Sequence, residues 1–141
     1  EYGLDRFWPL GRRITLLNSI EGGAVFGDNI FNNELYRIGG INLLRGFDEE
    51  DIWVSMYNIA TVEFRFLLTN NSFVNVFFDA AYVEDRSLGQ YSNDWPYGFG
   101  AGLSFSTSAG MFSVNYAYGS QQGNPINFRA AKVHFGYVNN F

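Results

Sequence analysis

Hydrophobic and polar residues alternate with a period of two along most of the chain, a pattern that predicts β-strands. The pattern covers seven segments: residues 1–8, 12–26, 52–67, 73–83, 96–107, 110–119 and 128–140. Most of these segments exceed the ~5–6 residues of a typical globular strand. Their length suits a tilted crossing of a bilayer, which takes about 9–11 residues.

The connections between these strands alternate between short and long. Short turns are expected at residues 9–11, 68–72 and 108–110, and long loops at residues 27–51, 84–95 and 120–127. Short turns at one rim and long loops at the other are typical of an outer-membrane barrel, in which residues 27–51 would be an extracellular loop.

The two faces of the strands differ in character. One face is apolar and includes Val62, Phe64, Phe66, Val74, Val76, Phe78, Leu103, Phe105, Val114, Tyr116, Val133 and Phe135. The other is polar and rich in small residues, including Glu63, Arg65, Asn75, Asp79, Gly98, Gly100, Gly102, Ser104, Ser113, Asn115, Lys132 and His134. A soluble barrel or sandwich would bury the apolar face, so alternation alone leaves both orientations open.

Two observations favour the membrane orientation. The polar face carries few charges and many glycines, which suits a lumen better than a surface exposed to water. The apolar face carries aromatic residues near both rims, as lipid-facing barrels do. These residues are Tyr82, Tyr97 and Tyr118 toward the long loops, and Phe66, Phe105, Phe112 and Phe141 toward the short turns.

The composition of the chain argues against several classes of function. The chain has 141 residues, which indicates a single domain over residues 1–141, and only 16% of them are charged, against ~25% in soluble proteins. It has no cysteine, one histidine and a net charge of −5, with Lys132 the only lysine. We therefore expect no metal site, no cofactor and no nucleic-acid partner. A hydrolase would depend on His134 alone, so we expect no catalytic residues and no enzyme.

The long loop contains an arginine in an unusual setting, Arg45 between Leu44 and Gly46. A turn centred near Asn71 would pair Phe64 with Phe78 and Phe66 with Val76, and would place Glu63 directly opposite Asp79. Two opposed carboxylates repel and favour a cation between them. Arg65 on the same strand and Arg45 from the loop are both candidates for that cation.

The loop sequence resembles a known motif. Gly39-Gly40 followed by Leu44-Arg45-Gly46-Phe47 resembles the (V/I/L)-R-G-(F/Y) motif of the BamA-type outer-membrane assembly and translocation barrels, the bacterial surface antigen family. In that family the motif precedes the fifth strand from the end and is folded into the lumen, and Arg45 occupies the same position. The resemblance implies that Arg45 contacts Glu63 and Asp79.

The last residues resemble the terminal signal by which barrels are delivered for assembly. His134, Gly136 and the final aromatic Phe141 match its polar, glycine and aromatic positions. Asn139 departs from it, because an apolar residue is expected two positions before the end. An ordinary lipid-facing last strand would explain the aromatic residues equally well.

The resemblance implies a protein of the bacterial outer membrane that acts without nucleotide or covalent step. The implied function is an insertase, whose partners are the lipid bilayer and unfolded outer-membrane proteins, and whose first and last strands form a seam. A polypeptide translocation or secretion pore of the same superfamily is one alternative. A small structural outer-membrane barrel is another.

The number of predicted strands, seven, is odd, whereas single-chain bacterial barrels have an even number. We therefore expect a strand before Glu1 and a short eight-stranded barrel; the alternative is the C-terminal half of a sixteen-stranded barrel. Eight strands leave an interior just wide enough for side chains. In a short barrel Arg45 should only dip into the outer mouth, and deeper penetration would favour the larger barrel.

Overall fold

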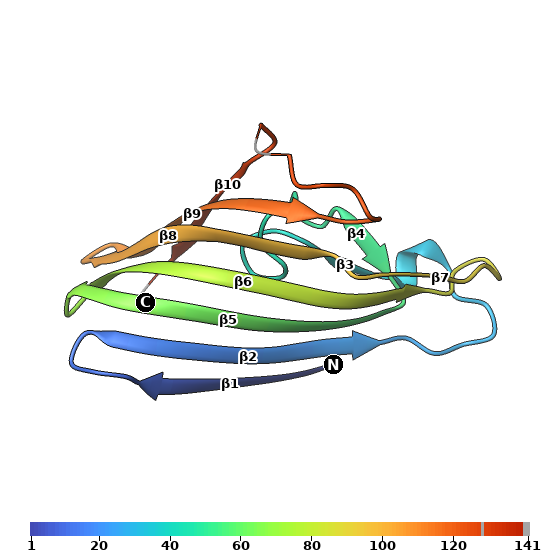
Figure 1. Ribbon diagram of the computed structural model, residues 1–141. Helices are drawn as coiled ribbons and strands as arrows, with labels where there is room; N and C mark the ends of the chain where they lie inside the picture. The colour runs from blue at the N-terminus through green and yellow to red at the C-terminus, as the bar shows by residue number, and fades with distance from the viewer. Residues whose placement is uncertain (128, 140–141) are drawn as a thin grey trace.

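The computed structural model describes residues 1–127 and 129–139, which form an all-β, antiparallel fold (Figure 1). The main sheet has the strand order β1-β2-β5-β6-β8-β9-β10, and β7 pairs with the outer end of β6. These strands are β1 (Tyr2–Pro9), β2 (Ile14–Ala24), β5 (Met56–Thr69), β6 (Ser72–Asp85), β7 (Ser92–Asp94), β8 (Tyr97–Thr107), β9 (Gly110–Ser120) and β10 (Lys132–Val138). The predicted all-β antiparallel fold is confirmed.

The long loop between β2 and β5 has structure of its own. It contains a 3₁₀ turn, η1 (Asn32–Glu34), and a small two-stranded sheet of β3 (Tyr36–Ile38) and β4 (Ile52–Val54). Figure 1 shows the short turns of the main sheet at one end, on the left, and the long connections at the other. The predicted strand at 52–67 therefore divides into β4 and β5. Of the predicted strand at 128–140, residues 128 and 140 lie outside the described residues, and β10 covers Lys132–Val138.

The apolar face of the sheet points outward and is exposed. Val76 and Tyr116 keep 55% and 51% of their surface accessible, whereas Glu63 and Asp79 on the opposite face keep 3% and 1%. This is the reverse of a water-soluble protein, because a large exposed apolar patch marks contact with a membrane or a partner. The alternation of the strands thus places lipid-compatible side chains outside and polar ones inside.

Aromatic side chains gather near both ends of the outward face. Tyr82 packs against Trp95 with ring centroids 4.7 Å apart near the long connections. Phe112 packs against Phe105 at 5.4 Å and Tyr137 at 4.8 Å near the short turns. These clusters correspond to the two predicted aromatic bands, apart from Phe141, which lies outside the described residues.

The predicted pairing of β5 with β6 is wrong by two residues. Glu63 lies opposite Phe77, and Asp79 lies opposite Thr61. Thr69 pairs with Ser72 beside the turn, so the turn is centred before Asn71, and an irregularity between Leu67 and Thr69 then shifts the register further, so that Leu67 pairs with Phe73. A shift of two residues keeps both carboxylates on the same face, because side chains alternate with a period of two.

The loop packs on the inner face of β5 and β6 near their outer ends. Its buried side chains join inward-facing residues of these two strands in one apolar cluster: Ile38, Leu44, Phe47, Val54, Tyr57, Ile59, Ala81 and Val83. Near the outer end of β5 the inward residues Tyr57 and Ile59 are apolar and buried, and this surface receives the loop. Hydrophobic burial therefore fixes the loop inside the curve of the sheet.

Within the residues that the structure describes, β1 and β10 are the edges of the sheet and are not paired with each other. No helix in residues 1–127 and 129–139 has the length and apolar character needed to cross a membrane.

Candidate functional site

Arg45 forms an ion-pair cluster with both predicted carboxylates. Its Nε and Nη2 atoms donate to the two oxygens of Asp79, each at 2.8 Å, and its backbone N–H donates to Asp79 Oδ2 at 3.0 Å. Its Nη1 donates to Glu63 Oε2 at 2.5 Å. The planar guanidinium can make these paired contacts, whereas a lysine ammonium cannot.

Each carboxylate also accepts a hydrogen bond from a residue of β5. Thr61 Oγ1 donates to Asp79 Oδ1 at 2.9 Å, and Arg65 Nε donates to Glu63 Oε1 at 2.6 Å. Both arginines considered from the sequence thus bind Glu63. Two arginines balance two carboxylates, which is the condition for keeping charges in a buried place.

The guanidinium of Arg45 also lies over an aromatic ring. Its Cζ atom is 3.5 Å from the centroid of Phe77, the residue opposite Glu63 on β6. Only 11% of the Arg45 side chain is exposed, which strengthens a cation–π contact because less water competes for the charge. The sequence analysis did not identify Phe77. It could have done so, because Phe77 is two residues from Asp79 on the same strand and therefore shares its inward face.

The partners of Arg45 lie deep in the sheet. Glu63 and Asp79 are near the middle of β5 and β6, each of which has 14 residues. Arg45 therefore lies deeper than the outer mouth, the position predicted for it in a short barrel. The apolar cluster above it explains the depth, because Leu44 and Phe47 are buried on the inner face of the strands.

The glycines of the motif allow backbone shapes that other residues rarely adopt. Gly39, Gly40 and Gly46 have φ angles of +112°, +106° and +103°. A Cβ on Gly40 would overlap the Glu49 carboxylate, which accepts a hydrogen bond from the Ile41 N–H at 2.8 Å. The segment Gly39–Glu50, called the Arg45 loop below, thus closes on itself.

Glycines on β8 and β9 let the Arg45 loop approach their backbones. A Cβ on Gly98 would lie 1.8 Å from the Arg45 carbonyl oxygen, and one on Gly119 would lie 2.6 Å from the Gly46 carbonyl oxygen. A Cβ on Gly46 would in turn lie 2.4 Å from the Tyr118 carbonyl oxygen. The glycines of the inner face therefore allow the loop backbone to pack directly against the backbones of β8 and β9.

The last strand contacts the same loop. The Gly46 N–H donates to His134 Nε2 at 3.2 Å, and Lys132 Nζ donates to Asp48 Oδ2 at 2.7 Å. His134 and Gly136 were predicted as part of a terminal signal, and the structure places His134 against the loop motif. Phe141, the third residue of that predicted signal, lies outside the described residues.

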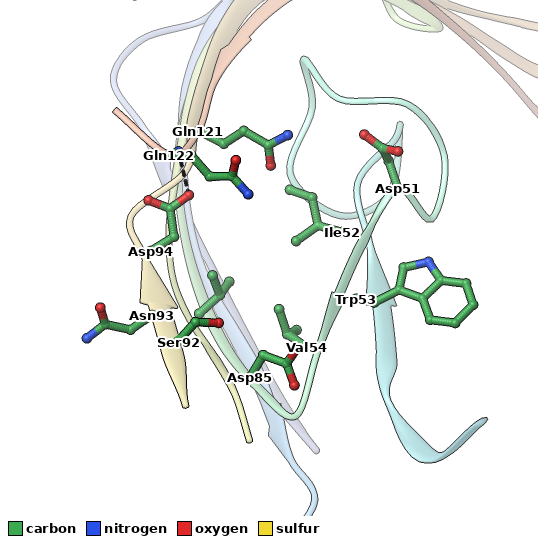
Figure 2. Close-up of a pocket in the computed structure, with 11 residues that line it drawn as sticks. Asp51, Ile52, Trp53, Val54, Asp85, Ser92, Asn93, Asp94, Gln121 and Gln122 are labelled. Carbon is green, nitrogen blue, oxygen red and sulfur yellow. Dashed lines mark hydrogen bonds between the residues drawn. The ribbon is translucent and has the colours of Figure 1, made fainter. Parts of the chain in front are cut away.

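A cavity of about 390 Å³ lies at the outer end of the loop. Figure 2 shows Asp94 accepting a hydrogen bond from the backbone N–H of Gln122, at 2.7 Å, and Trp53 pointing away from the cavity. Asp85 accepts another from the Ser87 N–H at 2.8 Å. Both carboxylates therefore accept hydrogen bonds from loop backbones. Among the described residues, no cluster of metal-binding side chains was found.

A comparison with models of protein families matches the Omp85 superfamily domain over residues 1–141. The chain belongs to the Omp85 superfamily. This membership agrees with the resemblance seen in the loop motif, and Omp85 proteins are outer-membrane proteins. At the level of the superfamily it supports insertion or translocation of proteins at the outer membrane. No curated protein and no solved structure matched the chain.

Proposed function

We propose that this Omp85 protein helps other outer-membrane proteins insert into the bacterial outer membrane. The observation that carries the proposal is the binding of Arg45 to Asp79 and Glu63. These bonds fix a loop inside the curved sheet. The fixed loop is then a structural element that supports the shape of the barrel wall.

The last strand supports an insertion role. Among the described residues, β10 pairs only with β9, so one row of its backbone N–H and C=O groups faces away from the sheet. Such an edge can pair with a strand of an incoming protein by β-augmentation. Gly136 within β10 weakens the local pairing, since glycine in a strand costs order and packing.

The depth of Arg45 favours a wide lumen. Loop backbone, as well as side chains, lies against the inner face at the level of Gly98, which pairs with Asp79. Eight strands would leave room for side chains only. We therefore infer that the sheet closes as part of a wider barrel. This corresponds to the sixteen-stranded alternative, not to the eight-stranded barrel expected from the sequence.

Reconstitution of the full protein in liposomes tests the proposal. The wild type should accelerate the folding of an added outer-membrane barrel, measured by protease protection, and Arg45→Ala should slow this while the variant itself remains a folded barrel. Arg37→Ala is the matched control, because Arg37 is an exposed loop arginine, 3.7 Å from Glu50. Equal acceleration by wild type and Arg45→Ala would contradict the proposed role of the loop.

Two other functions predict different results in the same liposomes. A polypeptide translocation pore would show large single-channel conductance that rises when Arg45 is removed, with no effect on the folding of added barrels. A structural barrel would show neither activity. If the wild type does not accelerate folding, the insertase proposal is rejected. The conductance measurement then distinguishes a translocation pore from a structural barrel.

A further inference from the structure

The inner face of the last strand is occupied by the Arg45 loop at three successive positions. Lys132 binds Asp48 at 2.7 Å, and His134 accepts a hydrogen bond from the Gly46 N–H. A Cβ on Gly136 would lie 2.7 Å from Ile41 Cδ1. Because side chains alternate along a strand, these contacts form one continuous row.

The three contacts differ in strength. Lys132 and Asp48 are exposed at 37% and 63%, so their pair is weak in water. His134 is 6% exposed, and its partner Gly46 is also buried. The bond from Gly46 to His134 is therefore the polar link between the loop and β10 that water competes with least.

The direction of this bond fixes the protonation state of His134. The Gly46 N–H is a donor, so His134 Nε2 must offer a lone pair, which only the neutral ring has at that atom. A protonated ring would place an N–H against an N–H. The charged or titratable neighbours are Arg45, Asp48 and Glu49 of the loop and Lys132 of β10; β9 presents Asn115, which does not titrate.

We propose that His134 is a positioning residue that couples the last strand to the Arg45 loop, and that it does so only as the neutral imidazole. Through Gly46 the bond joins β10 to Arg45, and Arg45 joins the loop to β5 and β6. Movement of the last strand and release of the loop are therefore linked. Protonation of His134 favours both, which makes the loop sensitive to acid.

The coupling does not depend on which Omp85 activity the protein has. It concerns the position of the loop, which can be measured without a substrate. A failure of the insertase proposal would leave the coupling intact, and a failure of the coupling would show as an unchanged loop position in an otherwise active protein.

Distances between two nitroxide labels test the coupling in the full protein in liposomes. The labels are attached at Glu50→Cys in the loop and Val133→Cys on the outward face of β10; the chain contains no other cysteine. At pH 8 the wild-type background should give one short, narrow distance. At pH 5 a longer and broader population should appear, because losing a buried hydrogen bond lowers the ratio of docked to undocked loop by roughly tenfold.

Variants of His134 separate positioning from general stability. His134→Gln can accept the Gly46 N–H without titrating, so its distance should stay short at both pH values. His134→Ala should give the broad population at both. Lys132→Gln, the control, should resemble the wild type at pH 8 because its ion pair is exposed.

Three results would overturn the proposal. One is a short distance in His134→Ala at pH 8, another is an unchanged wild type at pH 5, and the third is equal broadening of the wild type and His134→Gln at pH 5. Because His134→Gln keeps a polar side chain of similar size, the pH comparison remains decisive even where His134→Ala folds poorly.

Discussion

The two carboxylates that hold Arg45 should not be equally important. Asp79 accepts four hydrogen bonds, three from Arg45 and one from Thr61. Glu63 accepts two, one from Arg45 and one from Arg65. We therefore expect Asp79→Asn to destabilise the folded loop more than Glu63→Gln does.

The difference can be estimated from the donors left without acceptors. Asparagine at position 79 has one acceptor oxygen and no charge, so in either amide orientation at least one Arg45 donor would face its NH₂ group and the paired contact with the guanidinium would be lost. Breaking a buried ion pair by removing one partner costs about 3–5 kcal/mol. Glutamine at position 63 leaves one donor facing an NH₂ group, and losing one hydrogen bond to a charged group costs about 1.5–3 kcal/mol. The side chains of Asp79 and Glu63 are only 2% and 4% exposed, so water offers little compensation.

Urea unfolding in liposomes, followed by the fluorescence of the three tryptophans, measures this difference. Asp79→Asn should lower the free energy of unfolding by about 2 kcal/mol more than Glu63→Gln, the difference between the middles of the two ranges. Glu50→Gln is the control for charge, since Glu50 is exposed and 3.7 Å from its arginine partner. Equal losses for the two variants, or a larger loss for Glu63→Gln, would refute the inequality derived from the donors.

Other variants test separate parts of the fold. Gly98→Ala should displace the Arg45 carbonyl and lower the free energy of unfolding by about 1–3 kcal/mol, because the added Cβ would lie 1.8 Å from that oxygen. Gly11→Ala, where a Cβ meets nothing within 4 Å, should have little effect in the same urea titration. Lys132→Gln should change stability by about 0–1 kcal/mol, less at high salt, as measured by repeating the titration with added sodium chloride. Val76→Arg on the outward face should cost about 2–4 kcal/mol in a bilayer, whereas Val76→Leu should stay near the wild type.

The sequence predicted the sheet well because its strands have a strict period of two. Long alternating segments with short turns between them leave few other folds, and the face carrying Phe64 and Val76 is outward, as predicted. The register of β5 and β6 was less predictable. It depends on the position of the turn and on one irregularity between Leu67 and Thr69, and alternation is unchanged by the resulting shift of two residues.

The loop was harder to predict than the strands. The motif and the parity of Glu63 and Asp79 indicated which charges would meet, but they carried no information on depth. Depth follows from the apolar inner surfaces of Ile59 and Val83, which bury Leu44 of the loop. The bond to His134 was not predictable, because it joins residues 88 positions apart through a backbone N–H.

The corrected register changes how the ion-pair cluster works. With Glu63 opposite Phe77, and Asp79 two residues beyond Phe77 on the same face, the carboxylates are diagonal neighbours and Phe77 is adjacent to both. The guanidinium of Arg45 can therefore span both acids and still lie 3.5 Å above Phe77. In the directly opposed arrangement, Phe77 would be opposite Arg65, adjacent to Asp79 and only diagonal to Glu63. The diagonal arrangement both pairs the charge and shields it from water, and it ties the relative register of β5 and β6 to the position of the loop.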